Sequence, residues 1–203
     1  MNDLVILVPD KNMEAAIKGI LSRHQSLGIR QVDHQVLLHP ARDSGCLKQG
    51  HDLLRPFSNR YAHGLVLFDR EGCGREAKAR EQLEDDVERQ LRASGWGDRS
   101  AAVVIDPELE IWVWSESAHV PGALGWESDL ASLRKWLIDH HFLTRDQTKP
   151  DRPKEAMEKI LRIRSKPRSS SIYFELAQKV GFQRCREPAF LKLRTTLAGW
   201  FPA

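Results

Sequence analysis

Two carboxylates stand directly after an apolar run near the middle of the chain. Residues 63–74 read H-G-L-V-L-F-D-R-E-G-C-G, so that Asp69 and Glu71 follow the run and two glycines follow them. Carboxylates one residue apart repel each other unless a cation lies between them, and their oxygens suit Mg²⁺ or Mn²⁺. The pair therefore predicts a divalent-cation site. The simpler interpretation is that Asp69 caps a helix and Glu71 is solvated.

The apolar run that precedes these acids predicts the element that positions them. Residues 65–68 are apolar without a polar break, which is typical of a strand buried on both faces of a parallel sheet. Similar runs at residues 4–8, 29–38 and 101–105 predict three more strands, and helical patterns separate them. We therefore expect an α/β fold with about four mainly parallel strands. Ligands bind at the carboxyl ends of such strands, where the acids would lie.

Other polar residues are predicted at the same edge of the sheet. Asp10 and Glu14 follow the first strand and could transfer a proton, while Arg42 follows the second strand and could meet a phosphate. Glu110 follows the fourth strand on an expected short helix, residues 109–115, although I-W-V-W would also suit a strand. With Asp69 and Glu71, Glu110 completes the predicted metal ligands.

The expected helices and loops complete the outline of the chain. Residues 13–24, with Asn12 as N-cap, and residues 47–57, 75–93 and 129–142 show helical patterns. Residues 39–46 and 119–125 are expected as loops, and Asp106-Pro107 as an N-cap with proline at the first helical position. A polar stretch at 144–153 precedes helices at 154–164, 170–180 and 188–200. We expect a core of residues 1–143 and a helical region of residues 144–203.

Charge is distributed unevenly along the chain. Residues 145–203 contain 14 Lys and Arg and 6 acids, a balance of +8, whereas the whole chain carries +3 and the preceding part therefore −5. A basic helical region could draw in the phosphates of nucleic acid. It could equally be a solvated face or one that packs on the acidic core.

Composition restricts the class of protein. Of 203 residues, 41% are hydrophobic and 29% are charged, which is typical of a globular protein. The first apolar run is too short for a signal sequence, and no 18 apolar residues are consecutive, so we expect a cytoplasmic protein without membrane contact. The three cysteines are widely spaced and predict free thiols rather than disulfides or a zinc site.

The order of these motifs resembles a known family. The chain is similar to the TOPRIM-like proteins of bacterial defence islands, which are related to RloB and to the nuclease half of OLD-family proteins. The similar stretches are V-P-D-K-N-M-E-A after the first strand, L-F-D-R-E-G-C-G at the family's D-x-D position, D-P-E-L-E-I-W, R-P-K-E-A-M-E-K-I-L, S-I-Y-F-E-L-A and F-L-K-L-R-T-T-L.

The resemblance implies a Mg²⁺-dependent (or Mn²⁺-dependent) core that acts on nucleic acid as one component of an antiphage system, alongside other defence proteins. In such a nuclease Asp69, Glu71 and Glu110 would hold the metal, and Arg42, Arg70 or Lys154 would meet the phosphate. Two departures stand against catalysis. Pro9 occupies the position of the family's glutamate, leaving Asp10 or Glu14 as substitutes, and Glu71 replaces an aspartate. The alternative is a non-catalytic subunit with a degenerate core that binds nucleic acid, a nucleotide or a protein.

Overall fold

The computed structural model describes residues 1–183 and 185–203, so Arg184, one of the basic residues counted above, lies outside the described residues. Its centre is one sheet of four parallel strands in the order β2-β1-β3-β4. The strands are β1 (Asn2–Val8), β2 (His34–Leu38), β3 (Tyr61–Asp69) and β4 (Ser100–Ile105). The predicted α/β class with four parallel strands is confirmed.

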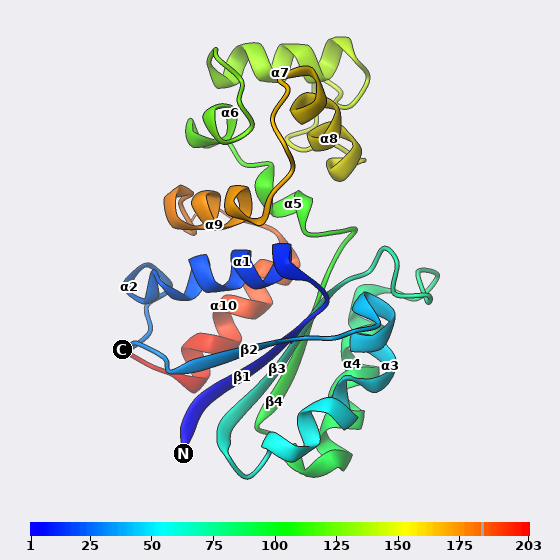
Figure 1. Cartoon of the computed structure of the whole chain (residues 1–203), viewed down its shortest axis with the longest axis vertical. Helices are drawn as coiled ribbons and strands as arrows, with labels where there is room; N and C mark the ends of the chain where they lie inside the picture. The colour runs from blue at the N-terminus through cyan, green and yellow to red at the C-terminus, as the bar shows by residue number, and fades with distance from the viewer. Residues whose placement is uncertain (184) are drawn as a thin grey trace.

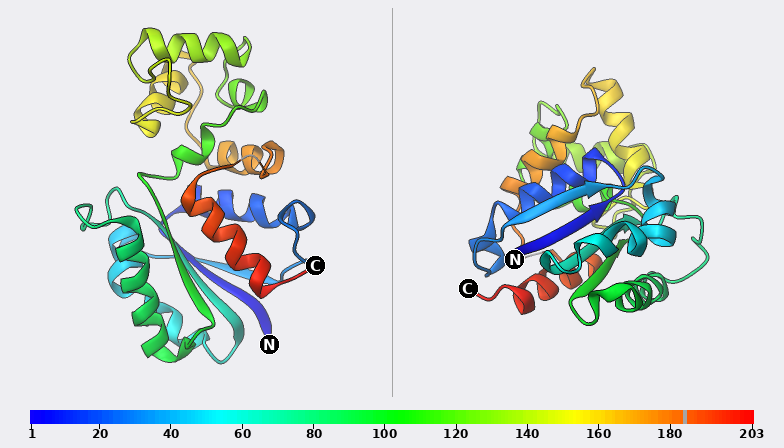
Figure 2. Two further views of the ribbon diagram at one scale, coloured as in Figure 1. Left: turned by 180° about the vertical axis from the view of Figure 1, so that it is seen from behind. Right: turned by 60° about the horizontal axis from the view of Figure 1, so that its bottom comes forward.

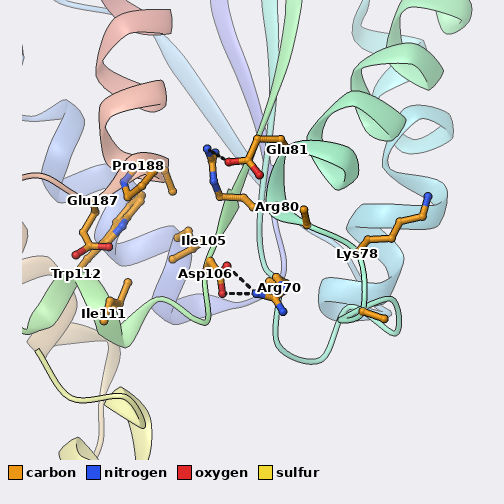
Figure 3. A pocket seen from close by; sticks show the side chains of 13 residues that line it. Arg70, Lys78, Arg80, Glu81, Ile105, Asp106, Ile111, Trp112, Glu187 and Pro188 are labelled. Carbon is orange, nitrogen blue, oxygen red and sulfur yellow. Dashed lines mark hydrogen bonds and ion pairs between the residues drawn. The ribbon is translucent and has the colours of Figure 1, made fainter. Parts of the chain in front are cut away.

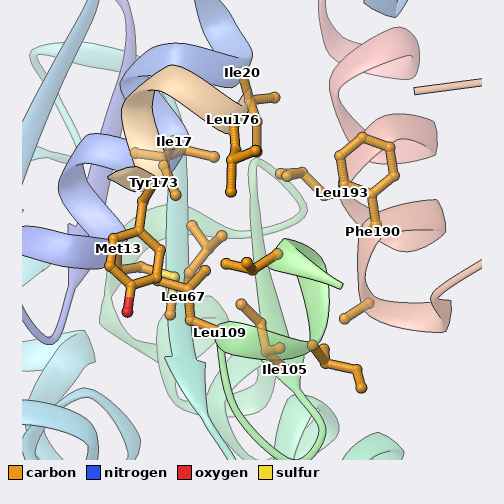
Figure 4. Packing of buried hydrophobic residues seen from close by; sticks show 14 of the residues in the cluster. Met13, Ile17, Ile20, Leu67, Ile105, Leu109, Tyr173, Leu176, Phe190 and Leu193 are labelled. Carbon is orange, nitrogen blue, oxygen red and sulfur yellow. The ribbon is translucent and has the colours of Figure 1, made fainter. Parts of the chain in front are cut away.

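Helices cover both faces of the sheet (Figure 1). One face carries α3 (Arg42–Leu54) and α4 (Arg80–Leu91), and the other carries α1 (Lys11–Leu21) and α10 (Pro188–Trp200), while α9 (Ser170–Lys179) packs on α1. Successive residues of a strand point to opposite faces. In β1, accordingly, Leu4 and Ile6 belong to one buried cluster and Val5 and Leu7 to the other. Figure 4 shows the first cluster, in which Tyr173 and Leu176 of α9 lie beside Met13 and Ile17 of α1.

The middle of the chain forms an outer lobe beyond the carboxyl edge of the sheet (Figures 1 and 2). It contains α6 (His119–Ala123), α7 (Leu130–Asp139) and α8 (Pro153–Ile163), and the short helix α5 (Glu110–Val113) connects it to β4. From the lobe the chain returns through α9, which packs along α1, and then through α10, which packs against β4. Three short turns complete the fold: α2 (His24–Leu27), η1 (Arg55–Phe57) and η2 (Arg92–Trp96).

Side chains close the outer edge of β4. The backbone N–H of Ala102 donates to Glu88 Oε1 at 3.0 Å, and that of Val104 donates to Glu84 Oε1 at 3.0 Å. Lys192 Nζ of α10 contacts both carboxylates, at 3.2 Å from Glu84 and 2.7 Å from Glu88. The two glutamates therefore supply acceptors that a fifth strand would otherwise supply.

Several local predictions are wrong. Asp10, not Asn12, is the N-cap of α1, because its carboxylate accepts the N–H groups of Asn12 and Met13 at 2.9 and 3.0 Å. The N-cap of α5 is Leu109, so Pro107 does not occupy its first position.

Two segments expected as loops contain helices. Residues 119–123 form α6, and α3 already begins at Arg42, inside the expected loop at 39–46. Packing explains the glycine at position 45 of that helix: a Cβ there would lie 2.0 Å from His39 Nδ1.

Within the described residues, no helix is both long enough and apolar enough to span a membrane.

Candidate functional site at the carboxyl edge of the sheet

Five carboxyl groups gather at the carboxyl ends of the strands. Strand order places the ends of β1, β3 and β4 side by side, so residues distant in sequence meet at one edge. We call them the edge cluster. Its members are Asp10 after β1, Asp43 in the first turn of α3, Asp69 at the end of β3, Glu108 after β4 and Glu110 at the start of α5.

Asp69 is the member whose pKa responds to the charges of the other four. Its Oδ1 atom is buried and has no hydrogen-bond partner in the described part of the chain. Burial, followed by the charges of Asp43, Glu110, Glu108 and Asp10, raises the pKa of Asp69 well above its usual range. The surroundings therefore favour the protonated, neutral form of Asp69 unless a nearby cation compensates its charge.

Asp43 joins the edge cluster through the backbone of β3. Its Oδ1 accepts the backbone N–H of Asp69 at 2.9 Å. Burial raises the pKa of Asp43, while this hydrogen bond acts in the opposite direction. The neighbouring Arg42 is exposed and has a left-handed backbone (φ 51°), and no hydrogen bond or ion pair of its side chain is found among the described residues. Of the three predicted phosphate-binding residues, Arg42 is therefore the one without a partner in that part of the chain.

Glu110 is turned toward the helical region rather than toward the acids of β3. It is 2% exposed, and its Oε1 accepts hydrogen bonds from Tyr173 Oη of α9 at 2.5 Å and from Arg168 Nη2. Burial and the charge of Glu110 raise the pKa of Tyr173, which stays a hydrogen-bond donor. Arg168 also pairs with Glu158 at 2.8 Å. One oxygen of this buried carboxylate thus accepts two hydrogen bonds from the region after residue 144.

Glu108 also has a cationic partner from the region after residue 144. It is 7% exposed, and it accepts the backbone N–H of Lys154 at 3.2 Å and Lys154 Nζ at 3.3 Å. Burial alone would lower the pKa of Lys154, but the Glu108 and Glu110 carboxylates outweigh it, and the pKa is raised. Lys154, a predicted phosphate-binding residue, is therefore held by Glu108 as a cation.

Asp10 and Glu14, the predicted proton-transfer residues, also have structural partners. Asp10 caps α1 through the N–H groups of its first turn. Glu14 pairs with Lys11 at 2.8 Å and with Lys18 at 2.7 Å along one face of α1. Pro9 is buried and places no acid or base at the edge.

Arg70 and Glu71 lie on the loop that follows β3. Glu71 is exposed, and its backbone N–H donates to Pro107 O at 2.9 Å. Arg70 Nη1 contacts both carboxylate oxygens of Asp106, at 2.8 and 2.7 Å, and its other nitrogens donate to Glu76 O. This pair borders a cavity of about 500 Å³ (Figure 3), whose basic side chains all have acidic partners. The cavity also borders Lys78 and Arg80.

The three predicted metal ligands do not fit a metal ion in this arrangement. Glu71 is in solvent, Glu110 is bound by Tyr173 and Arg168, and Asp69 alone of the three has a buried oxygen without a partner among the described residues. Across residues 1–183 and 185–203, no three His, Cys, Asp or Glu side chains are grouped so that they could hold one. The structure places Asp69 and Glu110 at the same edge but does not join them with Glu71 as ligands of one cation.

The sequence does not predict the part that Arg168 and Tyr173 play at this edge. Arg168 belongs to a run of basic residues in which nothing distinguishes it. Tyr173 carries a weak signal, because it is the only side chain with a hydroxyl group in the buried stripe of α9.

Many of the basic residues after position 144 are paired within the chain. Of the 13 that the structure describes, seven form ion pairs: Lys149, Arg152, Lys154, Arg164, Arg168, Lys179 and Lys192. Lys192 and Lys154 reach acids of the core. In these cases the basic region packs on the acidic core, which was one of the two alternatives. On α8, Lys159 and Arg162 are exposed, and no partner for them is found among the described residues.

Comparison with models of protein families, with curated proteins and with solved structures finds no match to this chain. Its function is therefore inferred from the residues, the geometry and the motif resemblance.

Proposed function

We propose that this protein is a non-catalytic component of a bacterial antiphage defence system, in which a degenerate TOPRIM-like core binds nucleic acid. The observation that carries the proposal is the pairing at the edge of the sheet: Glu108 and Glu110 are neutralised by Lys154 and Arg168 of the same chain. A nuclease of this kind needs carboxylates that are free to hold a cation. The motif resemblance supplies the expectation of a defence role.

Nucleic acid is the partner that the charge distribution favours. Lys159 and Arg162 lie one turn apart on α8, so they point to the same side of the helix and are both exposed. Arg145, which precedes this helix, is also exposed. Exposed basic side chains without acidic partners remain available to phosphates, whereas paired ones would first have to leave an acid.

The proposal can be tested with fluorescently labelled single-stranded and duplex DNA and RNA. We expect binding that weakens steeply as NaCl rises from about 50 to about 200 mM. Replacing both Lys159 and Arg162 with Gln should lower the affinity and reduce the slope of log K against log salt by about 0.7 to 0.9 for each phosphate that the variant no longer neutralises.

The matched control replaces Arg89 and Arg92 with Gln. These two exposed arginines have the same spacing at the far end of α4, away from the lobe. The control should bind like the wild type. Absence of binding at low salt, or an equal loss of affinity in the two variants, would refute the proposed surface.

A metal-dependent nuclease is the second candidate, and the crowding of Asp10, Asp43 and Asp69 favours it. Acids without a cationic partner at one strand edge destabilise a fold through mutual repulsion, so such clusters often mark functional sites. Mg²⁺ or Mn²⁺ can be bound through one or two carboxylates with water and substrate phosphates. Cleavage of DNA or RNA that requires Mn²⁺ and disappears in Asp69→Ala would favour this candidate over the binding subunit.

A further inference from the structure

The two buried acids after β4, Glu108 and Glu110, have their charges compensated by side chains of the same chain. Glu108 and Glu110 are 7% and 2% exposed, respectively, and burial together with the nearby charge of Glu110 raises the pKa of Glu108. Two adjacent buried carboxylates require compensating positive charge. In a metal site of this composition a divalent cation would provide it.

Here the compensating charges come from two side chains that are distant in sequence from Glu108 and Glu110. Lys154 stands in the first turn of α8, and Arg168 stands just before α9. Together they carry two positive charges, the charge of one divalent cation. The Arg168 guanidinium bridges Glu110 to Glu158, and Lys154 donates to Glu108 through both its backbone N–H and its Nζ.

We propose that Lys154 and Arg168 occupy the electrostatic position of a divalent cation and hold the outer lobe on the carboxyl edge of the sheet. This inference rests on the proposed function, in which the edge acts without a metal, and it specifies what replaces the metal. Lys154 lies in the first turn of α8 and Arg168 lies after its last turn, so the two ion pairs attach the chain near both ends of this helix to residues after β4. Divalent cations and these two side chains then compete for the same carboxylates.

The attachment has uncharged contacts beside it, so the lobe does not depend on the ion pairs alone. The indole N–H of Trp114 donates to Pro153 O at 2.9 Å within the buried interior, next to Lys154. Tyr173 Oη donates to the same Glu110 oxygen at 2.5 Å, and this hydrogen bond does not require the Arg168 side chain. A variant without the two cations should therefore keep its fold while exposing Glu108 and Glu110 to cations from solution.

The test measures Mn²⁺ binding by calorimetry and melting temperature with and without Mn²⁺ in wild type and in Lys154→Met/Arg168→Met. The wild type should show little Mn²⁺ response. The double variant should melt at lower temperature, bind Mn²⁺ more tightly by about tenfold or more, and recover part of the lost melting temperature when Mn²⁺ is added.

Two further variants keep the result interpretable. Arg152→Met/Lys159→Met removes two exposed cations, the N-cap of α8 and a residue within it, that touch no buried acid and should gain no Mn²⁺ response. Lys154→Met alone is the milder change in case the double variant does not fold, since its side chain is 43% exposed, and it should gain a smaller response.

Three outcomes would overturn the inference. They are equal Mn²⁺ binding in wild type and Lys154→Met/Arg168→Met, no Mn²⁺ stabilisation of either variant that lacks Lys154, and an equal gain in the Arg152→Met/Lys159→Met control. The proposed function is judged separately, because its nucleic-acid binding is measured on the wild type without Mn²⁺. Wild type that binds DNA or RNA yet also binds Mn²⁺ tightly would refute this inference and leave the binding function standing.

Discussion

Substitution of Glu84 measures how much the side-chain hydrogen bonds at the outer edge of β4 contribute to the free energy of unfolding. It is 3% exposed and accepts three hydrogen bonds, from Val104 N at 3.0 Å, from Arg80 Nη1 at 2.6 Å and from Lys192 Nζ at 3.2 Å. Glu84→Met keeps a similar volume and removes every acceptor. The buried N–H of Val104 then loses its partner.

The expected cost follows from these hydrogen bonds. A buried N–H without an acceptor costs about 1–3 kcal/mol, and hydrogen bonds to a charged group contribute about 1.5–3 kcal/mol each. Arg80 keeps Glu81 and Lys192 keeps Glu88, so only part of the charged contribution disappears. Allowing for the favourable burial of methionine, we expect a loss of about 2–4 kcal/mol in the free energy of unfolding. For a chain of this length the melting temperature should fall by about 5–15 °C.

Urea denaturation followed by circular dichroism measures this loss of stability. Glu84→Gln keeps an acceptor for Val104 and should lie between wild type and Glu84→Met. Glu81→Met removes an acid that is 66% exposed from the same helix and should change stability by no more than about 0.5 kcal/mol. If Glu84→Met costs no more than Glu81→Met, the carboxylates of α4 do not stabilise β4 in the way described.

Two other predictions concern the edge cluster and the packing of α9. Because the folded-state pKa of Asp69 is raised, ionisation of its carboxyl destabilises the fold as pH rises above its ordinary pKa of 3.8. Asp69→Asn should therefore be more stable than wild type near neutral pH, with a difference that disappears toward pH about 4 in urea titrations, and a pH-independent difference would contradict this. Gly19→Ala should cost about 1–3 kcal/mol in urea unfolding, because its Cβ would lie 2.8 Å from Ala177 Cβ and 2.9 Å from Phe174 O. Gly199→Ala, in open space on α10, should instead be neutral or stabilising by up to about 1 kcal/mol, and equal effects at the two glycines would refute the packing argument.

The fold was largely predictable from the sequence because its strands are short, continuous apolar runs. Residues 65–68 and 101–105 have no polar interruption, and both lie in strands buried on two faces. Helix starts were less predictable, since they depend on contacts outside the helix. Gly45, with serine beside it, is typical of a loop, yet it lies in α3, where glycine is needed because the His39 ring occupies the space of a side chain.

The candidate site was predictable in its place but not in its partners. Strand order follows from the topology of parallel units, so Asp69 and Glu110 were expected at one edge. That Lys154 and Arg168 would neutralise the acids after β4 could not be expected, because 46 and 58 residues separate the partners and their meeting depends on how the lobe folds back. The same limit applies to Arg70, which lies beside two acids in sequence but pairs with Asp106 across the loop.

The two edges of the sheet differ in what they offer to another polypeptide chain. On β4, the carboxylates of Glu84 and Glu88 already take the backbone N–H groups of Val104 and Ala102, so an added strand would have to displace buried charged groups. On β2, the described residues place no strand beyond it. Addition of a strand, whether from a second copy or from a peptide, would therefore be directed to β2, and a second copy could pair only through its own β2.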